Sequence, residues 1–339
     1  MKRLGSIFDE VVTFKNLENA SKKALKGQKK FKKNGAFFYI NLEKEIIKLE
    51  QEIVSQRYQP SGYTCFIITD PKTRKICAAN FRDRVVHHAI CNVIEPHLDK
   101  KLIYDTYACR KGKGTHAAMK RAQVFLRKNE YYLKCDIQKY FETINHEILK
   151  KILNKKLKDK KVIHLLNKII DTPYPSSYKG RGVPIGNLTS QIFANLYLGE
   201  LDNFIKNTLK IKPYLRYMDD FLVFDADKSK LHEWLYEINY FVTHQLDLTL
   251  KEKIMRIAPV SEGVPFLGFR IFKGTIRLQR QNFIRFCRNL KKQEQCYVNG
   301  EIDEADLIAS VGSMLAHISH ANTYKMRKSI FARTNNLGC

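Results

Sequence analysis

Two adjacent aspartates, Asp219 and Asp220, are the residues of this chain best suited to chemistry. They end the tetrad 217–220, which lies between two short apolar runs, 214–215 and 221–224. Aspartate is disfavoured inside strands and frequent in turns, so the pattern predicts a β-hairpin with both carboxylates at its tip. There they could converge on one divalent cation, although an Asp-Asp pair is also a common turn dipeptide.

A third carboxylate, Asp136, stands near the end of the strand-like run 131–137, far upstream of the pair. A helix is predicted after it, because Asn145 can cap an N-terminus. Apolar residues follow at helical spacing: Ile148, Leu149, Ile152 and Leu153. Two cations held by carboxylates from two strands serve phosphoryl transfer, one activating a hydroxyl and the other stabilising the leaving group. The three aspartates are predicted to form such a site.

The charge balance points to a polyanionic partner. The chain has 60 Lys and Arg against 34 Asp and Glu, a formal charge of +26 over 339 residues. Phosphate contacts release counterions, so such a surface binds nucleic acid in a salt-dependent way. Lysines gather near the N-terminus as either an RNA-binding arm or a solvated face: Lys22, Lys23, Lys26, Lys29, Lys30, Lys32 and Lys33, around Phe31. An amphipathic helix is predicted next, with Leu42, Ile46, Leu49 and Ile53 on one face.

The cysteines and the apolar runs indicate a cytoplasmic protein. Eight cysteines are scattered without a Cys-x-x-Cys pair and are predicted to be reduced thiols. His87, His88 and Cys91 stand at helical metal spacing, but no second ligand pair is visible, so we interpret them as structural. No apolar run reaches the ~18 residues of a membrane span, and the Lys-rich N-terminus has no adjoining signal segment.

Five segments, in order, resemble the motifs of reverse transcriptases, and the similarity covers most of the chain. The first metal-site motif resembles 135–141, the loop-helix motif resembles 182–191, and the second metal-site motif is the tetrad 217–220. A lysine after a Leu-Thr-Leu run matches Lys253, and the primer-grip turn resembles 266–269. The resemblance implies an α+β right-hand polymerase fold with fingers, an antiparallel-sheet palm and a helical thumb.

The resemblance also implies a domain order. A basic helical extension at the entry to the fingers would cover 1–60, interleaved fingers and palm 61–275, and the thumb 276–339. Two amphipathic helices are predicted in the thumb, with Asn299-Gly300 as the turn between them. Their apolar residues are Phe283, Cys287 and Leu290 in the first, then Leu307, Val311, Met314, Leu315 and Ile318 in the second.

For an RNA-directed DNA polymerase, the resemblance implies a role for each matched residue. Two Mg²⁺ ions, with Mn²⁺ as a possible substitute, would be bound by Asp136, Asp219, Asp220 and the carbonyl of Ile137. Lys253 would donate a proton to the leaving pyrophosphate. The incoming dNTP would contact Lys72, Arg74, Ile137, Phe141, Ile185, Gly186 and Gln191, with the Phe141 ring excluding a ribose hydroxyl by clash. Template and primer would contact Arg82, Arg110, Lys111, Lys113, Phe266, Leu267 and Gly268.

Departures from the commoner pattern refine the resemblance. Group II intron and retron enzymes usually have Gln-Gly and Ser-Pro where this chain has Ile185-Gly186 and Ser190-Gln191. This variant, with segments 62–90 and 314–324, resembles the reverse transcriptases of diversity-generating retroelements, which are bacterial, archaeal or phage-encoded. The resemblance implies error-prone cDNA synthesis with errors at template adenines, from a template RNA through an RNA/DNA hybrid. It also implies an accessory basic oligomeric protein as partner.

Two other classes stay open. One is a retron- or antiviral-type reverse transcriptase that makes untemplated DNA, although no retron-specific signature is recognisable. The other is a catalytically silent RNA-binding scaffold, against which the intact carboxylates argue.

Overall fold

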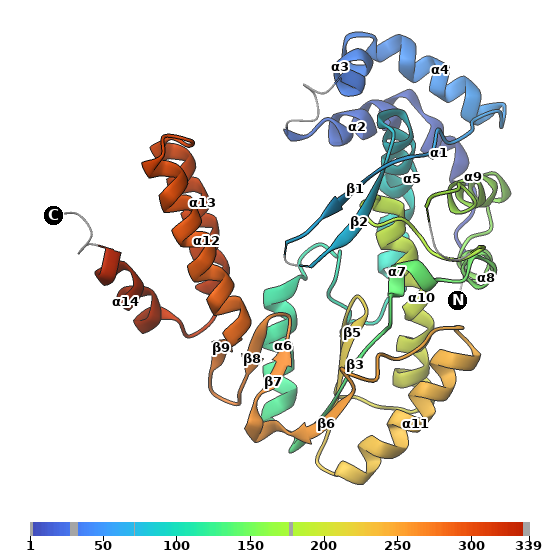
Figure 1. Ribbon diagram of the computed structural model, residues 1–339. Coiled ribbons are helices and arrows are strands. Elements are labelled where there is room, and N and C mark those ends of the chain that lie inside the picture. The colour runs from blue at the N-terminus through green and yellow to red at the C-terminus, as the bar shows by residue number, and fades with distance from the viewer. Residues whose placement is uncertain (1–2, 28–32, 71, 176–178, 335–339) are drawn as a thin grey trace.

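The computed structural model describes residues 3–27, 33–70, 72–175 and 179–334, with side chains up to 331. It has the α+β right-hand architecture, so the predicted fold class is confirmed (Figure 1). Part of the lysine-rich arm, including Lys29, Lys30, Phe31 and Lys32, lies outside the described residues. Among the described residues, no helix combines the length and the apolar character needed to cross a bilayer.

Four helices form the N-terminal unit: α1 (Phe8–Val12), α2 (Phe14–Ala24), α3 (Lys33–Ile40) and α4 (Leu42–Val54). Helices α1, α2 and α3 pack on the long helix α5 (Phe81–Asp99), and α4 packs on those three helices. The predicted amphipathic helix is confirmed as α4, because Ile46 and Leu49 are fully buried. Two lysines of α2 have partners within the protein, since Lys22 pairs with Glu18 and Lys23 donates to Asn92 on α5.

A two-stranded antiparallel hairpin, β1 (Tyr63–Ile68) and β2 (Arg74–Ala79), precedes α5. Cys65 and Cys77 are directly opposite in its register and form a disulfide. The prediction that all cysteines are free thiols is therefore wrong for this pair. Scattered positions in the sequence could not show that hairpin register places two of them face to face.

The palm is a four-stranded antiparallel sheet in the order β4-β5-β3-β6. Its strands are β3 (Tyr131–Asp136), β4 (Tyr214–Tyr217), β5 (Asp220–Asp225) and β6 (Arg256–Pro259). Alternate residues point to opposite faces, so Leu133 and Val223 face one core while Tyr132 and Leu222 face another. Helices α10 (Leu188–Asn203) and α11 (Lys228–His244) cover the first face, and α6 (Thr115–Arg127) covers the second.

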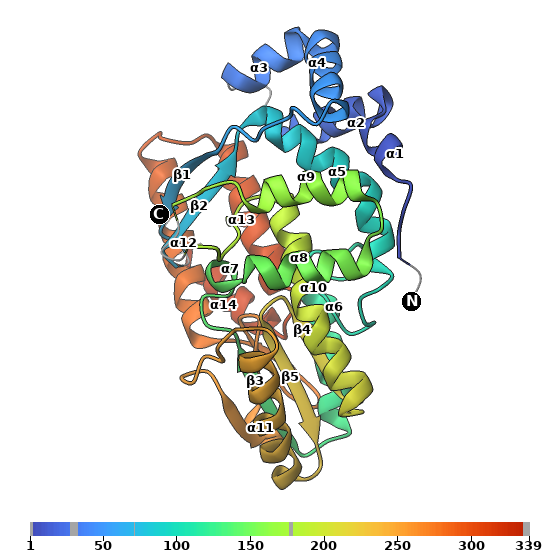
Figure 2. The same cartoon turned by 90° about the vertical axis from the view of Figure 1, so that its right-hand side faces the viewer.

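Three helices connect β3 to α10: α7 (Tyr140–Thr143), α8 (His146–Lys156) and α9 (Lys160–Ile170). The capped helix predicted after Asp136 is confirmed as α8, where the Asn145 side chain accepts from the N–H groups of Glu147 and Ile148. Figure 2 shows α8, α9 and α10 lying between the N-terminal unit and α11. A π-helical turn, η2 (Phe204–Thr208), continues α10.

A small sheet spans position 276, the predicted boundary between the palm and the thumb. After the 3₁₀ turn η3 (Val260–Glu262), the strands β7 (Val264–Phe266), β8 (Phe269–Ile271) and β9 (Ile276–Leu278) pair in order. Helices α12 (Arg280–Val298), α13 (Glu304–Ile318) and α14 (Tyr324–Thr334) follow. The two predicted helices and the turn at Gly300 are confirmed, but the region from 276 starts with a strand and has a third helix.

Candidate active site

The predicted catalytic hairpin is present, formed by β4 and β5. Tyr217 pairs with Asp220, so Met218 and Asp219 make a two-residue turn. On the other side of β5, Asp136 is the direct register partner of Asp220. Opposed residues of an antiparallel pair project to the same face. Strand register therefore brings Asp136 against Asp220 and leaves Asp219 at the adjoining tip.

The three carboxylates share a half-buried environment. Burial raises the pKa of Asp219 to about 6, and the negative charge of Asp136 adds to this rise. Burial also raises the pKa of Asp220 to about 6 and raises the pKa of Asp136. Grouped carboxylates with raised pKa values are stabilised in their charged form by a cation, which is the electrostatic condition for a metal site.

A test of metal fit comes from the ligand atoms. Asp220 Oδ1 is buried and has no hydrogen-bond partner within the described part of the chain, so it is placed to accept a cation. Over the same residues, no set of three or more His, Cys, Asp or Glu side chains forms a metal cage by itself. Mg²⁺ in polymerases is typically held by one or two carboxylates together with substrate phosphates, so an incomplete protein cage agrees with that ion.

Two lysines that the sequence reasoning missed act on these carboxylates. The Lys134 ammonium lies 2.9 Å from Asp220 Oδ2 and donates to the Pro265 carbonyl on β7, also at 2.9 Å. Lys134 precedes Asp136 by two residues on β3, so strand alternation already put both on one face. The second is Lys251, whose backbone N–H donates to the Asp136 carbonyl at 2.8 Å and whose charge lowers the pKa of Asp136.

The position of Lys251 changes the interpretation of the lysine motif. Lys253, the predicted proton donor, has an exposed side chain, whereas Lys251 is half-buried beside Asp136. Leu250 forms a bridge with Ile137, which anchors this segment to the end of β3. The structure therefore brings Lys251, in place of Lys253, to the carboxylates.

The fingers hairpin presents cations to the same site. Lys72 and Arg74 are exposed. The charge of Lys72 lowers the pKa of Asp136, and that of Arg74 lowers the pKa of Asp219. Two predicted triphosphate contacts are thus within electrostatic reach of the palm carboxylates.

Of the four predicted template cations, Arg82 and Arg110 form ion pairs within the protein. Arg82 forms an ion pair with Glu52. Arg110 forms a forked ion pair with Asp99 and donates to three backbone carbonyls. In place of the predicted template contact, the structure assigns Arg110 to holding its own loop. Lys111 is exposed, and the Lys113 ammonium lies 3.4 Å from the Tyr104 ring centre.

The loop before α10 is fastened to the fingers. The Ile185 carbonyl accepts from the Cys77 N–H at 3.0 Å, and the Asn187 side chain bonds both Ala79 and Cys77. Gly186 has φ 116°, and a Cβ there would lie 2.9 Å from Ile76 Cγ2. A side chain at this position would therefore be strained and crowded, which explains the glycine.

Two further predicted nucleotide contacts adjoin this loop. The Phe141 side chain is half-buried and packs edge-on against Tyr140, with ring centres 5.8 Å apart. Its carbonyl accepts from the Val183 N–H at 2.7 Å, so Phe141 and the loop are joined. Gln191 is half-buried in the first turn of α10.

The predicted primer-grip turn is the β7–β8 hairpin tip. Phe266 is fully buried and serves the core, whereas Leu267 and Gly268 are half-buried at the tip. Both have positive φ, 49° and 87°. The Asn282 side chain of α12 donates to the Gly268 carbonyl at 2.7 Å. A Cβ on Gly268 would lie 2.2 Å from the Asn282 amide nitrogen. Close approach of α12 requires glycine here.

Paired aspartates at the tip of a palm hairpin, cations on a facing hairpin and a helical thumb define a right-hand nucleic-acid polymerase. The chain belongs to the reverse transcriptase (RNA-dependent DNA polymerase) family, whose profile matches residues 68–271.

Individual proteins agree with this assignment. Protein YkfC of Escherichia coli (strain K12) is 23% identical over 283 residues. The match covers 71% of this chain and 74% of YkfC. Group II intron-encoded protein LtrA of Lactococcus lactis subsp. cremoris is 21% identical over 330 residues. The match covers 77% of this chain and 54% of LtrA. The chain thus spans about half the length of LtrA.

A solved structure shares the fold. Telomerase from Candida tropicalis, in complex with a fragment of telomeric RNA, matches with a TM-score of 0.51 at 11% identity. The match covers 86% of this chain and 58% of that one.

Proposed function

We propose that this protein is an RNA-directed DNA polymerase that copies a template RNA from dNTPs. The observation that carries the proposal is the register of β3 with β5, which opposes Asp136 to Asp220 beside Asp219. The raised pKa values of Asp219 and Asp220 support a requirement for divalent cations, as does Asp220 Oδ1, which has no hydrogen-bond partner among the described residues. Mg²⁺ is the proposed cofactor and Mn²⁺ its substitute.

The chain's own residues have separable roles in this mechanism. Asp136, Asp219 and Asp220, with the carbonyl of Ile137, would hold the metals. When bound, the metals activate the primer 3′-hydroxyl and stabilise charge on the pyrophosphate. Lys72 and Arg74 would neutralise and orient the triphosphate, Arg74 through its planar fork.

Two more side chains act on selection and proton transfer. Phe141 would exclude ribonucleotides by occupying the space beside C2′. Phe141→Ala should then raise ribonucleotide incorporation relative to deoxyribonucleotide incorporation in primer extension. Lys251 is the nearer candidate for donating a proton to the pyrophosphate, with Lys253 the alternative.

The finer proposal is that the polymerase belongs to a diversity-generating retroelement and makes cDNA with errors at template adenines. Support comes from Ile185-Gly186 and Ser190-Gln191, and from the position of Ile185 in the loop that contacts the fingers. An apolar side chain there cannot donate the hydrogen bond that an amide could make to the nascent pair. The accessory basic oligomeric protein and a cytoplasmic location are parts of this proposal.

Sequencing the product made on a defined RNA tests both levels of the proposal. Complementary cDNA with substitutions concentrated opposite adenine would support the retroelement enzyme. Faithful complementary cDNA would support the polymerase and contradict the finer proposal. DNA unrelated to the RNA would contradict templated synthesis, and absence of Mg²⁺-dependent product would contradict the polymerase itself.

A further inference from the structure

The catalytic turn contains a strained residue. Met218, immediately before Asp219, has φ 57°, in the left-handed region that residues with a Cβ disfavour. Residues persist in such conformations only where their surroundings hold them there. Something next to Met218 must therefore stabilise the turn that sets the position of Asp219.

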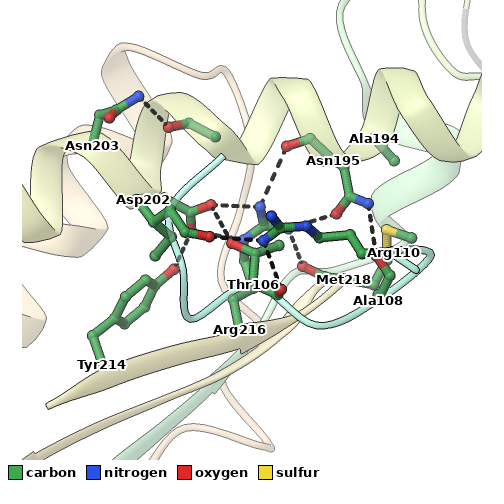
Figure 3. A network of polar contacts seen from close by, with 12 residues as sticks. Thr106, Ala108, Arg110, Ala194, Asn195, Asp202, Asn203, Tyr214, Arg216 and Met218 are labelled. Atoms are coloured by element: carbon green, nitrogen blue, oxygen red, sulfur yellow. Dashed lines mark hydrogen bonds and ion pairs between the residues drawn. The ribbon is translucent and has the colours of Figure 1, made fainter. Parts of the chain in front are cut away.

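Arg216 lies directly behind this turn and is fully buried (Figure 3). One of its terminal nitrogens donates to the Met218 carbonyl at 2.8 Å and to Asn195 Oδ1 at 3.4 Å. The other donates to Asp202 Oδ2 at 2.6 Å and to the Asn195 carbonyl at 3.3 Å, while Nε donates to Asp202 Oδ1 at 2.7 Å. All five N–H groups of the guanidinium are used.

Asp202 fixes the other side of Arg216. Besides its two bonds from Arg216, the carboxylate accepts from the Tyr214 hydroxyl at 2.6 Å and from the Thr106 hydroxyl at 3.1 Å. Four donors occupy its acceptor sites, and the side chain is fully buried. A buried network with every partner satisfied rigidifies the groups it joins.

The network connects the turn to one long helix. Asn195 and Asp202 both lie on α10, which begins immediately after the loop containing Ile185 and Gly186. Asn195 also donates to the Ala108 carbonyl at 2.9 Å, so the loop before α6 joins the same network (Figure 3). The turn before Asp219 is thus bonded through Arg216 to α10, and the predicted nucleotide loop leads directly into the same helix.

We propose that Arg216 is a positioning residue that fixes Asp219 for metal binding by bonding the Met218 carbonyl from its anchor on Asp202. The inference rests on the proposed function, since it concerns the same metal site. A purely structural Arg216 would stabilise the core and leave metal affinity unchanged, which makes the two roles separable.

The first experiment uses Arg216→Lys in the full chain. Lysine retains the charge that neutralises Asp202 but lacks the fork that reaches Asp202 and Met218 together. Mn²⁺ affinity is measured by calorimetry without substrate, and polymerisation is measured against Mg²⁺ concentration. We expect Mn²⁺ affinity and kcat each to fall about tenfold, while the KM for primer–template stays within twofold of the unaltered protein. Unchanged Mn²⁺ affinity in a folded variant would overturn the proposal.

A matched control separates metal positioning from core stability. Tyr214→Phe removes one bond to Asp202 on the side away from Met218. It should lower the melting temperature without changing Mn²⁺ affinity. If both variants lose affinity in proportion to the stability they lose, Arg216 is only structural and the proposal fails.

The second experiment relieves the strain directly, and replaces the first if Arg216→Lys does not fold. Met218→Gly and Met218→Ala both remove the side chain, but only glycine accepts positive φ freely. Each is combined with Arg216→Lys or, in its place, Asp202→Asn. Glycine should recover Mn²⁺ affinity several-fold more than alanine does.

Equal recovery by glycine and alanine would contradict a role in holding Met218. Because Mn²⁺ binding is measured without substrate, its result stands even if the unaltered protein shows no polymerisation. A failure of the proposed function is therefore distinguishable from a failure of this one.

Discussion

Two β-hairpins of this protein face the same site but differ in how far they are buried. The palm hairpin β4–β5 is buried: Leu215, Phe221 and Leu222 have no exposed surface. The fingers hairpin β1–β2 is largely solvated, with Phe66 51% and Ile67 67% exposed. It is held by one disulfide and by hydrogen bonds to the loop before α10.

The difference in burial corresponds to the charged side chains that each hairpin presents. The palm hairpin carries carboxylates whose separation must be fixed before metals bind, and buried packing provides that. The fingers hairpin carries Lys72 and Arg74, exposed cations that, as the proposed triphosphate contacts, would have to bind a substrate and release its product. Few buried contacts allow local movement at low cost in free energy.

The largest expected effect concerns the carboxylates of the palm hairpin and of the adjoining strand β3. Asp219→Asn or Asp136→Asn should reduce polymerisation by at least ~10³-fold, because each removes a metal-binding charge. RNA binding should persist, since it depends on the cationic surface. Primer extension and filter binding with the same purified variants check this. Substantial nucleotide incorporation by either variant would contradict the two-metal assignment.

Removing the fingers cations should have a smaller effect of a different kind. Lys72→Ala or Arg74→Ala should raise the KM for dNTP by about tenfold, because each charge is worth about 1.4 kcal/mol of phosphate binding. Lys75→Ala is the matched control, since Lys75 adjoins Arg74 on β2 and points to the other face. Steady-state kinetics at saturating primer–template measures the change. An equal effect from all three variants would show that only net charge matters.

The crowded carboxylates should make the metal-free protein sensitive to pH. The pKa of Asp219 is about 6 in the fold, against about 3.9 for an unfolded aspartate. Between these values the folded state binds more protons, so the free energy of unfolding falls as pH rises through that window. Above it, Asp219→Asn should stabilise the metal-free protein by on the order of 1–2 kcal/mol.

Denaturant unfolding in chelator at several pH values measures this gain. It should vanish below about pH 4, and Mg²⁺ should stabilise the unaltered protein but not the variant. Asp225→Asn, at the other end of β5, is the control and should show no such gain. A destabilised Asp219→Asn protein at neutral pH would contradict the raised pKa of Asp219, which burial and the charge of Asp136 cause.

Breaking the disulfide should affect the fingers hairpin alone. The bond closes a loop with a sequence separation of 12, and such a closure contributes at most about 2–3 kcal/mol. Cys65→Ser with Cys77→Ser should raise hydrogen exchange in 63–79 and raise the dNTP KM a few-fold. Metal affinity should stay unchanged. A loss of metal affinity would show that the two hairpins are not independent.

The smallest expected effect concerns Ile185, in the loop bonded to the fingers. Ile185→Gln would restore an amide that can hydrogen-bond the nascent pair, an interaction worth about 1 kcal/mol. Misincorporation opposite template adenine should fall several-fold without loss of synthesis. Ile185→Leu, which remains apolar, is the control. Sequenced cDNA with an unchanged error spectrum would leave Ile185 as a packing residue.

Local sequence determined the elements that carry the chemistry. The Asp219-Asp220 pair between apolar runs predicted the palm hairpin, and Asn145 before an amphipathic pattern predicted α8. Both depend on neighbours a few residues apart, and the structure confirms both. The charge excess and the polymerase architecture were equally readable, because composition and ordered motifs need no three-dimensional information.

Tertiary structure alone decided which polar groups meet. Arg110, a predicted template contact, pairs with Asp99. No role was predicted for Arg216, one residue before the tetrad, although it is fully buried against Asp202. Cys65 and Cys77 became a disulfide only through hairpin register. Such pairings depend on how strands align and which helix covers them. The sequence shows that a side chain is charged, but not whether solvent or a buried partner stabilises that charge.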